Sequence, residues 1–192
     1  MKLTSEEALN MLKEAEKATT DTGWIKHSIC VGNSAGKIAE ALGLDADKAK
    51  ALGYIHDIGK AVGEIKGHDI NGYEYIKSLG YDDEYANICL THSYLNNDVY
   101  CTAGGVPSDI PFRTEFIKNH KYTIYEKIIN LCDLMCTSVN VTLEKRLIDI
   151  MIRRGVHENT IYHIKEAQKL KQEFDDMLGY NVYNLFPDVI NN

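Results

Sequence analysis

A histidine and an aspartate are adjacent near the end of a predicted helix. The run Tyr54–Lys60 reads Tyr-Ile-His-Asp-Ile-Gly-Lys, which puts the imidazole of His56 beside the carboxylate of Asp57. An acidic N-cap region upstream and Gly59 as a C-terminal cap predict a helix over about 46–58. Neighbouring helical residues point roughly 100° apart, so these two side chains can reach one cation only from neighbouring directions. Other elements must supply the remaining ligands.

Four more residues of ligand type occur in separate predicted helices. His27 and His92 fall on inward, apolar faces, and His68 is expected at a helix N-terminus, where exposed N–H groups favour an anion. Asp133 lies within an apolar stretch, where a carboxylate is costly unless it is paired or bound to a cation. Imidazole and carboxylate ligands without thiolate suit divalent transition metals such as Fe, Mn, Co, Ni or Zn.

The order of these six residues, His, His-Asp, His, His, Asp, resembles that of the HD-domain metal-dependent phosphohydrolase superfamily, HDIG-type members included. His27, His56-Asp57 and Asp133 match its defining residues, and the run from His56 to Lys60 is close to the HDIGK form of many members. His68 and His92 match two further histidines of the dinuclear members. The resemblance spans about residues 22–140 and implies an all-α fold with a hydrolytic metal site.

The resemblance leaves two arrangements of the site open. In a dinuclear site, His27, His56 and Asp133 hold one ion, His68 and His92 hold the second, and Asp57 bridges the two. Two such ions can activate a water and clamp both oxygens of a phosphoryl displacement. In a mononuclear site, His68 and His92 orient the water or protonate the leaving group. Asp57, His68 and His92 are therefore the candidate catalytic residues, and one or two divalent transition metals are the expected cofactor.

The expected activity is that of a phosphomonoesterase or phosphodiesterase acting on a nucleotide or another small phosphorylated metabolite. Lys60 and Arg113 are the candidate contacts to a substrate phosphate. A non-catalytic module that senses a ligand or regulates a partner is a first alternative. A di-iron oxygenase is a second, because the same ligands can support either chemistry.

Composition restricts the class of protein. The 192 residues contain no Gly/Ser/Pro-rich linker, so we expect a single domain over 1–192. A net charge of −7 argues against a long nucleic acid as partner. No apolar run is long enough to cross a bilayer, the N-terminus is charged, and the five cysteines fit reduced thiols, so we expect a cytoplasmic protein without a membrane partner. No feature of the sequence indicates an oligomeric state.

The chain is predicted to be an all-α bundle of about seven to nine helices. Apolar residues recur at helical spacing, strand-like alternation is hard to find, and there are only three prolines. The helices are expected at about 4–19, 22–42, 46–58, 70–79, 82–95, 122–140, 142–154 and 158–178. The last two helices should complete the core, with Arg146 in a surface ion pair and His157 and His163 structural or exposed.

Residues 96–121 are predicted to form a loop, because turn formers dominate and the apolar residues have no period. Loops of this length within a compact domain are usually lids or disordered. The loop follows the His92 helix directly, so we expect it to border the pocket and to influence substrate choice. Its Arg113, Lys118, His120 and Lys121 are available to hold an anion.

Overall fold

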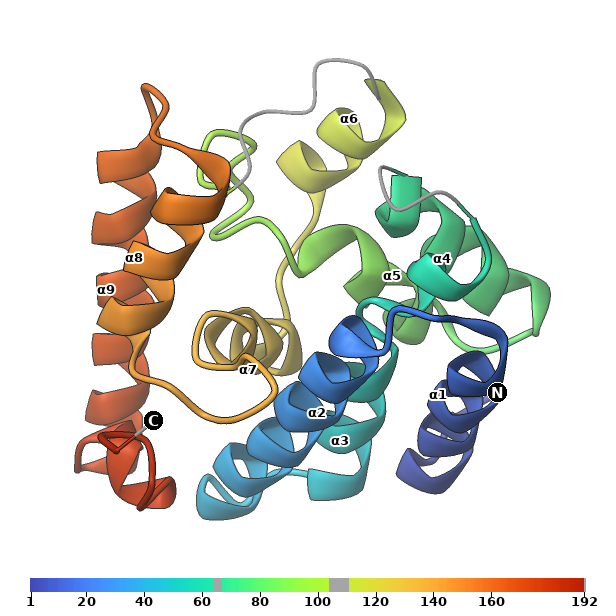
Figure 1. The fold of residues 1–192 in the computed structure, drawn as a ribbon, viewed down its shortest axis with the longest axis horizontal. Helices are drawn as coiled ribbons and strands as arrows, with labels where there is room; N and C mark the ends of the chain where they lie inside the picture. The colour runs from blue at the N-terminus through green and yellow to red at the C-terminus, as the bar shows by residue number, and fades with distance from the viewer. Residues whose placement is uncertain (64–66, 104–110, 192) are drawn as a thin grey trace.

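A computed structural model describes residues 1–63, 67–103 and 111–191, and these residues form an all-α fold (Figure 1). Its α-helices are α1 (Ser5–Ala18), α2 (Gly23–Ala41), α3 (Ala46–Ile55), α4 (His68–Ser78), α5 (Asp83–Thr91), α6 (Pro111–Asn119), α7 (Ile124–Asp133), α8 (Leu143–Arg154) and α9 (Thr160–Leu178). Short 3-10 helices cover Ile58–Ala61 (η1) and Val182–Leu185 (η3). The predicted fold class is confirmed.

Helices α2, α3 and α7 form the centre of the bundle, and the other helices are arranged around them. Helix α2 packs along α3 and also contacts α7. Helices α1, α4 and α5 lie on one side of this centre, and α8 and α9 lie on the other (Figure 1). One hydrophobic cluster extends from Leu3 in the N-terminal segment to Val189 near the C-terminus, with Leu52, Ile128 and Phe174 fully buried in it.

Local sequence signals explain where several helices begin. Thr4 and Thr123 each form a capping box with the glutamate three residues later, so α1 and α7 begin where their first backbone N–H groups have partners. Thr142 accepts a hydrogen bond from the backbone of Lys145 and begins α8 in the same way.

The structure corrects two predicted boundaries. The helix expected over 122–140 ends at Asp133, and the chain then turns through an isolated bridge between Cys136 and Asn140. The predicted loop at 96–121 contains α6, which begins at a proline, the residue that tolerates the first helical position best. Ile117 and Arg113 of α6 are buried, so tertiary packing stabilises this short helix. Residues 104–110 of that predicted loop lie outside the described residues.

None of the helices in the described ranges is both long and apolar enough to cross a lipid bilayer.

A close backbone approach at Gly59 joins η1 to α4. A Cβ atom at this position would lie 1.8 Å from the carbonyl oxygen of His68 and 2.5 Å from the backbone nitrogen of Gly72. Only glycine allows the two segments to be this close, and Asp57 and His68 immediately flank the contact. The spacing between these two side chains therefore depends on Gly59.

We predict that Gly59→Ala destabilises the protein by at least about 2 kcal/mol, because the new methyl group overlaps backbone atoms that cannot move independently. Urea unfolding measures this change. Gly67→Ala is the matched control, since a Cβ atom there would meet no neighbour closer than 3.5 Å. Equal stability of the two variants would contradict the close approach.

Candidate metal centre

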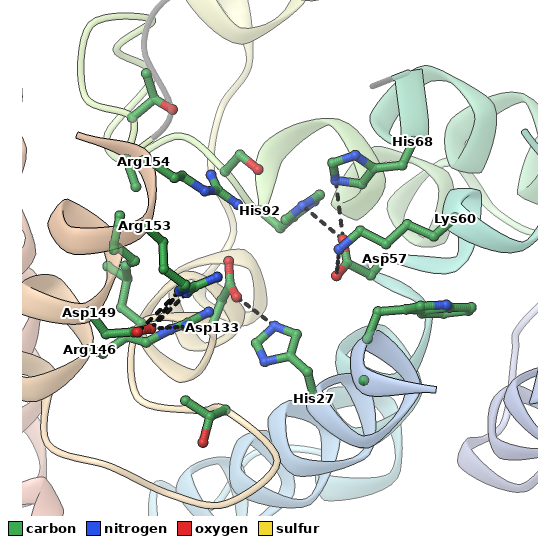
Figure 2. Close-up of a pocket in the computed structure, with 18 of the residues that line it drawn as sticks. His27, Asp57, Lys60, His68, His92, Asp133, Arg146, Asp149, Arg153 and Arg154 are labelled. Atoms are coloured by element: carbon green, nitrogen blue, oxygen red, sulfur yellow. Dashed lines mark hydrogen bonds and ion pairs between the residues drawn. The ribbon is translucent and has the colours of Figure 1, made fainter. Parts of the chain in front are cut away.

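Six side chains from five helical segments converge, and five of them line one wall of a cavity, the exception being the buried His56 (Figure 2). Each is placed at or near the end of an element, except His27, which lies within α2. His56 and His92 are the C-terminal caps of α3 and α5, Asp57 follows His56 directly, His68 is the first residue of α4, and Asp133 is the last residue of α7.

The convergence forms two groups of potential ligands that share Asp57. His27, His56 and Asp57 form one group, and Asp57, His68 and His92 form the other, each with its ligand atoms within 4.8 Å of one another. The two oxygens of Asp57 face different neighbours: Oδ1 lies 3.2 Å from Nε2 of His68, and Oδ2 lies 3.6 Å from Nε2 of His56. A single carboxylate is thus placed between both groups.

Asp133 adjoins the first group. Its Oδ1 lies 2.8 Å from Nε2 of His27 and 4.0 Å from Nε2 of His56. Nε2 of His92 completes the second group at 3.6 Å from Oδ1 of Asp57. All six predicted ligands are therefore neighbours in space.

Two histidines are held in the tautomer that a metal requires. Nδ1 of His56 lies 2.7 Å from the carbonyl oxygen of Gly53, and Nδ1 of His92 lies 3.2 Å from that of Ile88. A carbonyl oxygen can only accept, so each Nδ1 carries the hydrogen and each neutral ring presents a lone pair at Nε2. Nε2 of His56 is buried and has no hydrogen-bond partner among the described residues, an arrangement that a bound cation would satisfy.

The protonation states also suit a cation. Burial raises the pKa of Asp57, but the neighbouring His56 and a hydrogen bond from His68 outweigh it and hold that pKa well below its usual range. Burial lowers the pKa of His56 to about 4, so this ring is neutral at pH 7. Burial also disfavours a charge on His68, yet Asp57 and Asp69 raise its pKa to about 10. The proton on His68 is therefore one that a metal must displace.

A buried ion pair lies next to His68, a member of the second group of potential ligands. Asp69, 3% exposed, lies 2.9 Å from Nε2 of His68 through Oδ1 and pairs through Oδ2 with the guanidinium of Arg113. Arg113 is itself only 6% exposed and is not among the residues that line the cavity, and its predicted contact to a substrate phosphate stays a prediction. Lys60 does line the cavity and pairs with Asp57, and its contact to a substrate phosphate stays a prediction.

The cavity has a volume of about 510 Å³, within the range of small-molecule sites. Its wall away from the ligands is formed by α8, with Arg146, Asp149, Arg153 and Arg154 (Figure 2). Sequence reasoning assigned Arg146 to a surface ion pair and did not single out the others. Their signal is helical spacing, because positions 146, 149 and 153 share one face of α8.

His163 also lines this cavity, although the sequence indicated only a structural or exposed residue. It is 4% exposed, and its Nδ1 lies 3.8 Å from the thiol of Cys101. Burial lowers its pKa to about 4, so the ring is neutral and packs as a core residue.

Comparison with known proteins identifies the family. The HD domain model matches residues 24–137, more than half of the chain. The chain therefore belongs to the HD domain family, as the order of its histidines and aspartates suggested.

The curated relatives include several proteins named Ribonuclease Y. Those of Fervidobacterium nodosum and Thermotoga maritima are each 44% identical over 70 residues, which is 35% of this chain and 14% of the relative. That of Protochlamydia amoebophila is 45% identical over 65 residues, 33% of this chain and 12% of the relative. The chain thus spans only about a seventh of these proteins. No solved structure matches the chain.

We predict that Arg113→Gln lowers the free energy of unfolding by about 1.5–3 kcal/mol, because it removes a charged hydrogen-bond donor from the buried Asp69 carboxylate, which keeps only His68 as a cationic partner. Urea denaturation measures the loss. Lys118→Gln removes an exposed cation from the same helix and should change stability little. Adding Asp69→Asn to Arg113→Gln should recover part of the loss, and a fully additive double variant would contradict the pair.

Proposed function

We propose that this chain is a metal-dependent phosphohydrolase that acts on a nucleotide or another small phosphorylated metabolite through a metal-activated water. One observation carries the proposal: two groups of potential ligands share the buried carboxylate of Asp57 at the wall of a cavity of about 510 Å³. Histidines and carboxylates with a purely structural role would not direct their lone pairs toward one another beside such a cavity.

The residues present fit one or two divalent transition metals. His27, His56 and Asp133 would hold one ion, His68 and His92 the other, and Asp57 both. When bound, such ions supply Lewis acidity and a nucleophilic water at neutral pH. The hydrogen bonds from His56 and His92 to their own helices fix the direction of the two rings before substrate arrives.

The ammonium group of Lys60 places a positive charge at the same wall of the cavity. Its ammonium pairs with Asp57, and its side chain is 20% exposed to the cavity side. An arriving phosphate competes for this ammonium, which then donates to a phosphate oxygen. The lysine would bind and orient substrate without taking part in proton transfer.

A small substrate is favoured over a polymer. The net charge of −7 disfavours a nucleic acid as a broad-surface partner, and positive groups line the cavity itself. The relatives named Ribonuclease Y favour a second candidate, hydrolysis of a phosphodiester in RNA. Both candidate functions would use the same potential metal ligands, and they differ in the size of the substrate that must enter the cavity.

We predict that protein purified without chelator contains about two transition-metal equivalents, and that His68→Ala combined with His92→Ala lowers this to about one, because only the second ion loses its imidazoles. Elemental analysis measures both values. One equivalent in both proteins would support the mononuclear arrangement. No metal in either, even after reconstitution, would move the conclusion to a non-catalytic sensing module.

We predict that Asp57→Asn lowers hydrolysis by more than about 100-fold, because even the outer partners of metal ligands commonly contribute 10–100-fold. The assay is phosphate release from mononucleotides and small phosphate esters with Mn²⁺ or Fe²⁺, with a short RNA as a parallel substrate. His157→Ala, a histidine outside the cavity, should leave the rate unchanged.

The same assay separates the alternatives. Cleavage of the RNA without turnover of any small ester would favour the second candidate. Iron-dependent oxygen consumption without phosphate release would indicate an oxygenase. Equal rates for Asp57→Asn and the wild-type protein would refute the assigned site.

A further inference from the structure

The wall of the cavity that faces the metal ligands is cationic, although the chain as a whole is acidic. Arg146, Arg153 and Arg154 of α8 line it together with the single carboxylate of Asp149, which leaves a formal excess of two positive charges. No step in the proposed hydrolysis uses this wall. It also lies beyond residue 137, where the match to the family model ends.

Asp149 orients two of the three guanidinium groups. Arg153 donates to both of its oxygens, at 2.7–3.1 Å, and Arg146 donates to Oδ2 at 3.0 Å. Such bidentate pairs hold the planar groups in a fixed direction and leave other N–H donors available. The carboxylate therefore positions the arginines while only partly offsetting their charge.

Two donors at this wall lack protein partners. Nε of Arg146 is buried and has no hydrogen-bond acceptor within the part of the chain that the structure describes. Arg154 forms no ion pair with any residue of those same ranges, and its side chain extends along the cavity side of α8 (Figure 2). A buried polar group without a partner is costly, which applies to Nε of Arg146, whereas Arg154 is exposed. An oxyanion in the cavity would give both donors an acceptor.

The arginines of α8, called the arginine wall below, and five of the potential metal ligands line the same cavity. Arg146 lines the same cavity as His27 and Asp133. Figure 2 shows Asp133 projecting between the arginines and His27. A ligand in this cavity therefore has the arginines on one side and potential metal ligands on the other.

We propose that the arginine wall of α8 binds a second phosphate of the substrate, so that the preferred substrate is a small molecule with more than one phosphate, such as a nucleoside triphosphate. One phosphate lies at the metal ligands for hydrolysis, and a neighbouring phosphate accepts hydrogen bonds from Arg153 and Arg154. A monophosphate binds only at the metal ligands and makes no contact with the arginine wall. This inference rests on the proposed function for the fate of the first phosphate, but binding at the wall requires no turnover.

The test is isothermal titration calorimetry of the metal-loaded full chain in Mn²⁺. The probes are adenylyl imidodiphosphate, a triphosphate analogue with a blocked terminal linkage, and adenosine monophosphate. The wild-type protein should bind the triphosphate analogue about tenfold or more tightly than the monophosphate, because charge-assisted hydrogen bonds to arginine are among the strong ones. Arg153→Gln with Arg154→Gln should remove that advantage and change monophosphate binding less than about threefold.

Lys145→Gln is the matched control, because it removes an exposed cation from the same helix outside the cavity. Arg153 is 49% exposed, so the double variant should fold, and its unfolding temperature should stay within a few degrees of the wild type, as for other surface substitutions. Equal affinity of the wild type and the double variant for the triphosphate analogue would overturn the proposal, including the case in which neither binds. Weaker binding of a short RNA by the double variant, with binding of the analogue unchanged, would also overturn it.

These outcomes are distinguishable from failure of the proposed function. If the metal-loaded wild-type protein hydrolyses no phosphate ester, the hydrolase assignment fails, and calorimetry still decides whether the arginines bind the second phosphate. If small esters are hydrolysed but the double variant binds both probes like the wild type, the hydrolase stands and the arginine wall has no part in substrate choice.

Discussion

Burial of the Asp57 carboxylate is the constraint around which the structure is arranged. The residue is 3% exposed, and a buried charge is tolerated only when opposite charges or hydrogen bonds surround it. His68 and Lys60 supply these partners, and His56 and His92 each bring a ring nitrogen to 3.6 Å from the carboxylate, so four different segments meet there. No single helix can surround a carboxylate on all sides. Helices α3, α4 and α5 therefore each begin or end beside Asp57, and the packing of the fold brings these ends together.

Hydrogen bonds to their own helices orient two of the histidine rings. His56 and His92 bond to carbonyls of their own helices, three and four residues back, so their orientation depends little on the rest of the fold. His68 is different, because Asp69 and, through it, Arg113 hold it from α6. Movement of α6 would therefore disturb the second group of ligands and leave the first intact. The two groups of potential ligands differ in how strongly they depend on distant segments.

The convergence of the six potential ligands could be predicted from the sequence, because it followed from residue type and order, and both are visible without a structure. Helix α6 was missed, since its only strong signals are the buried Arg113 and Ile117, and burial is a tertiary property. The arginines of α8 were missed for a related reason. Arg146, Asp149 and Arg153 have the spacing of an ordinary surface ion-pair network, and that pattern is the same whether the face meets water or a cavity.

The potential metal ligands and the arginines of the opposite wall come from different parts of the chain. The potential metal ligands all lie between His27 and Asp133, inside the region that defines the family, whereas α8 lies after it. A hydrolytic site that two carboxylates and four imidazoles create has little to distinguish one phosphate from another. The opposite wall must supply that distinction, and a helix outside the family region can change its charges without disturbing the ligands. In this chain three arginines of α8 line that wall although the protein carries a net charge of −7, so positive charge gathers beside the potential metal ligands against the overall sign of the molecule.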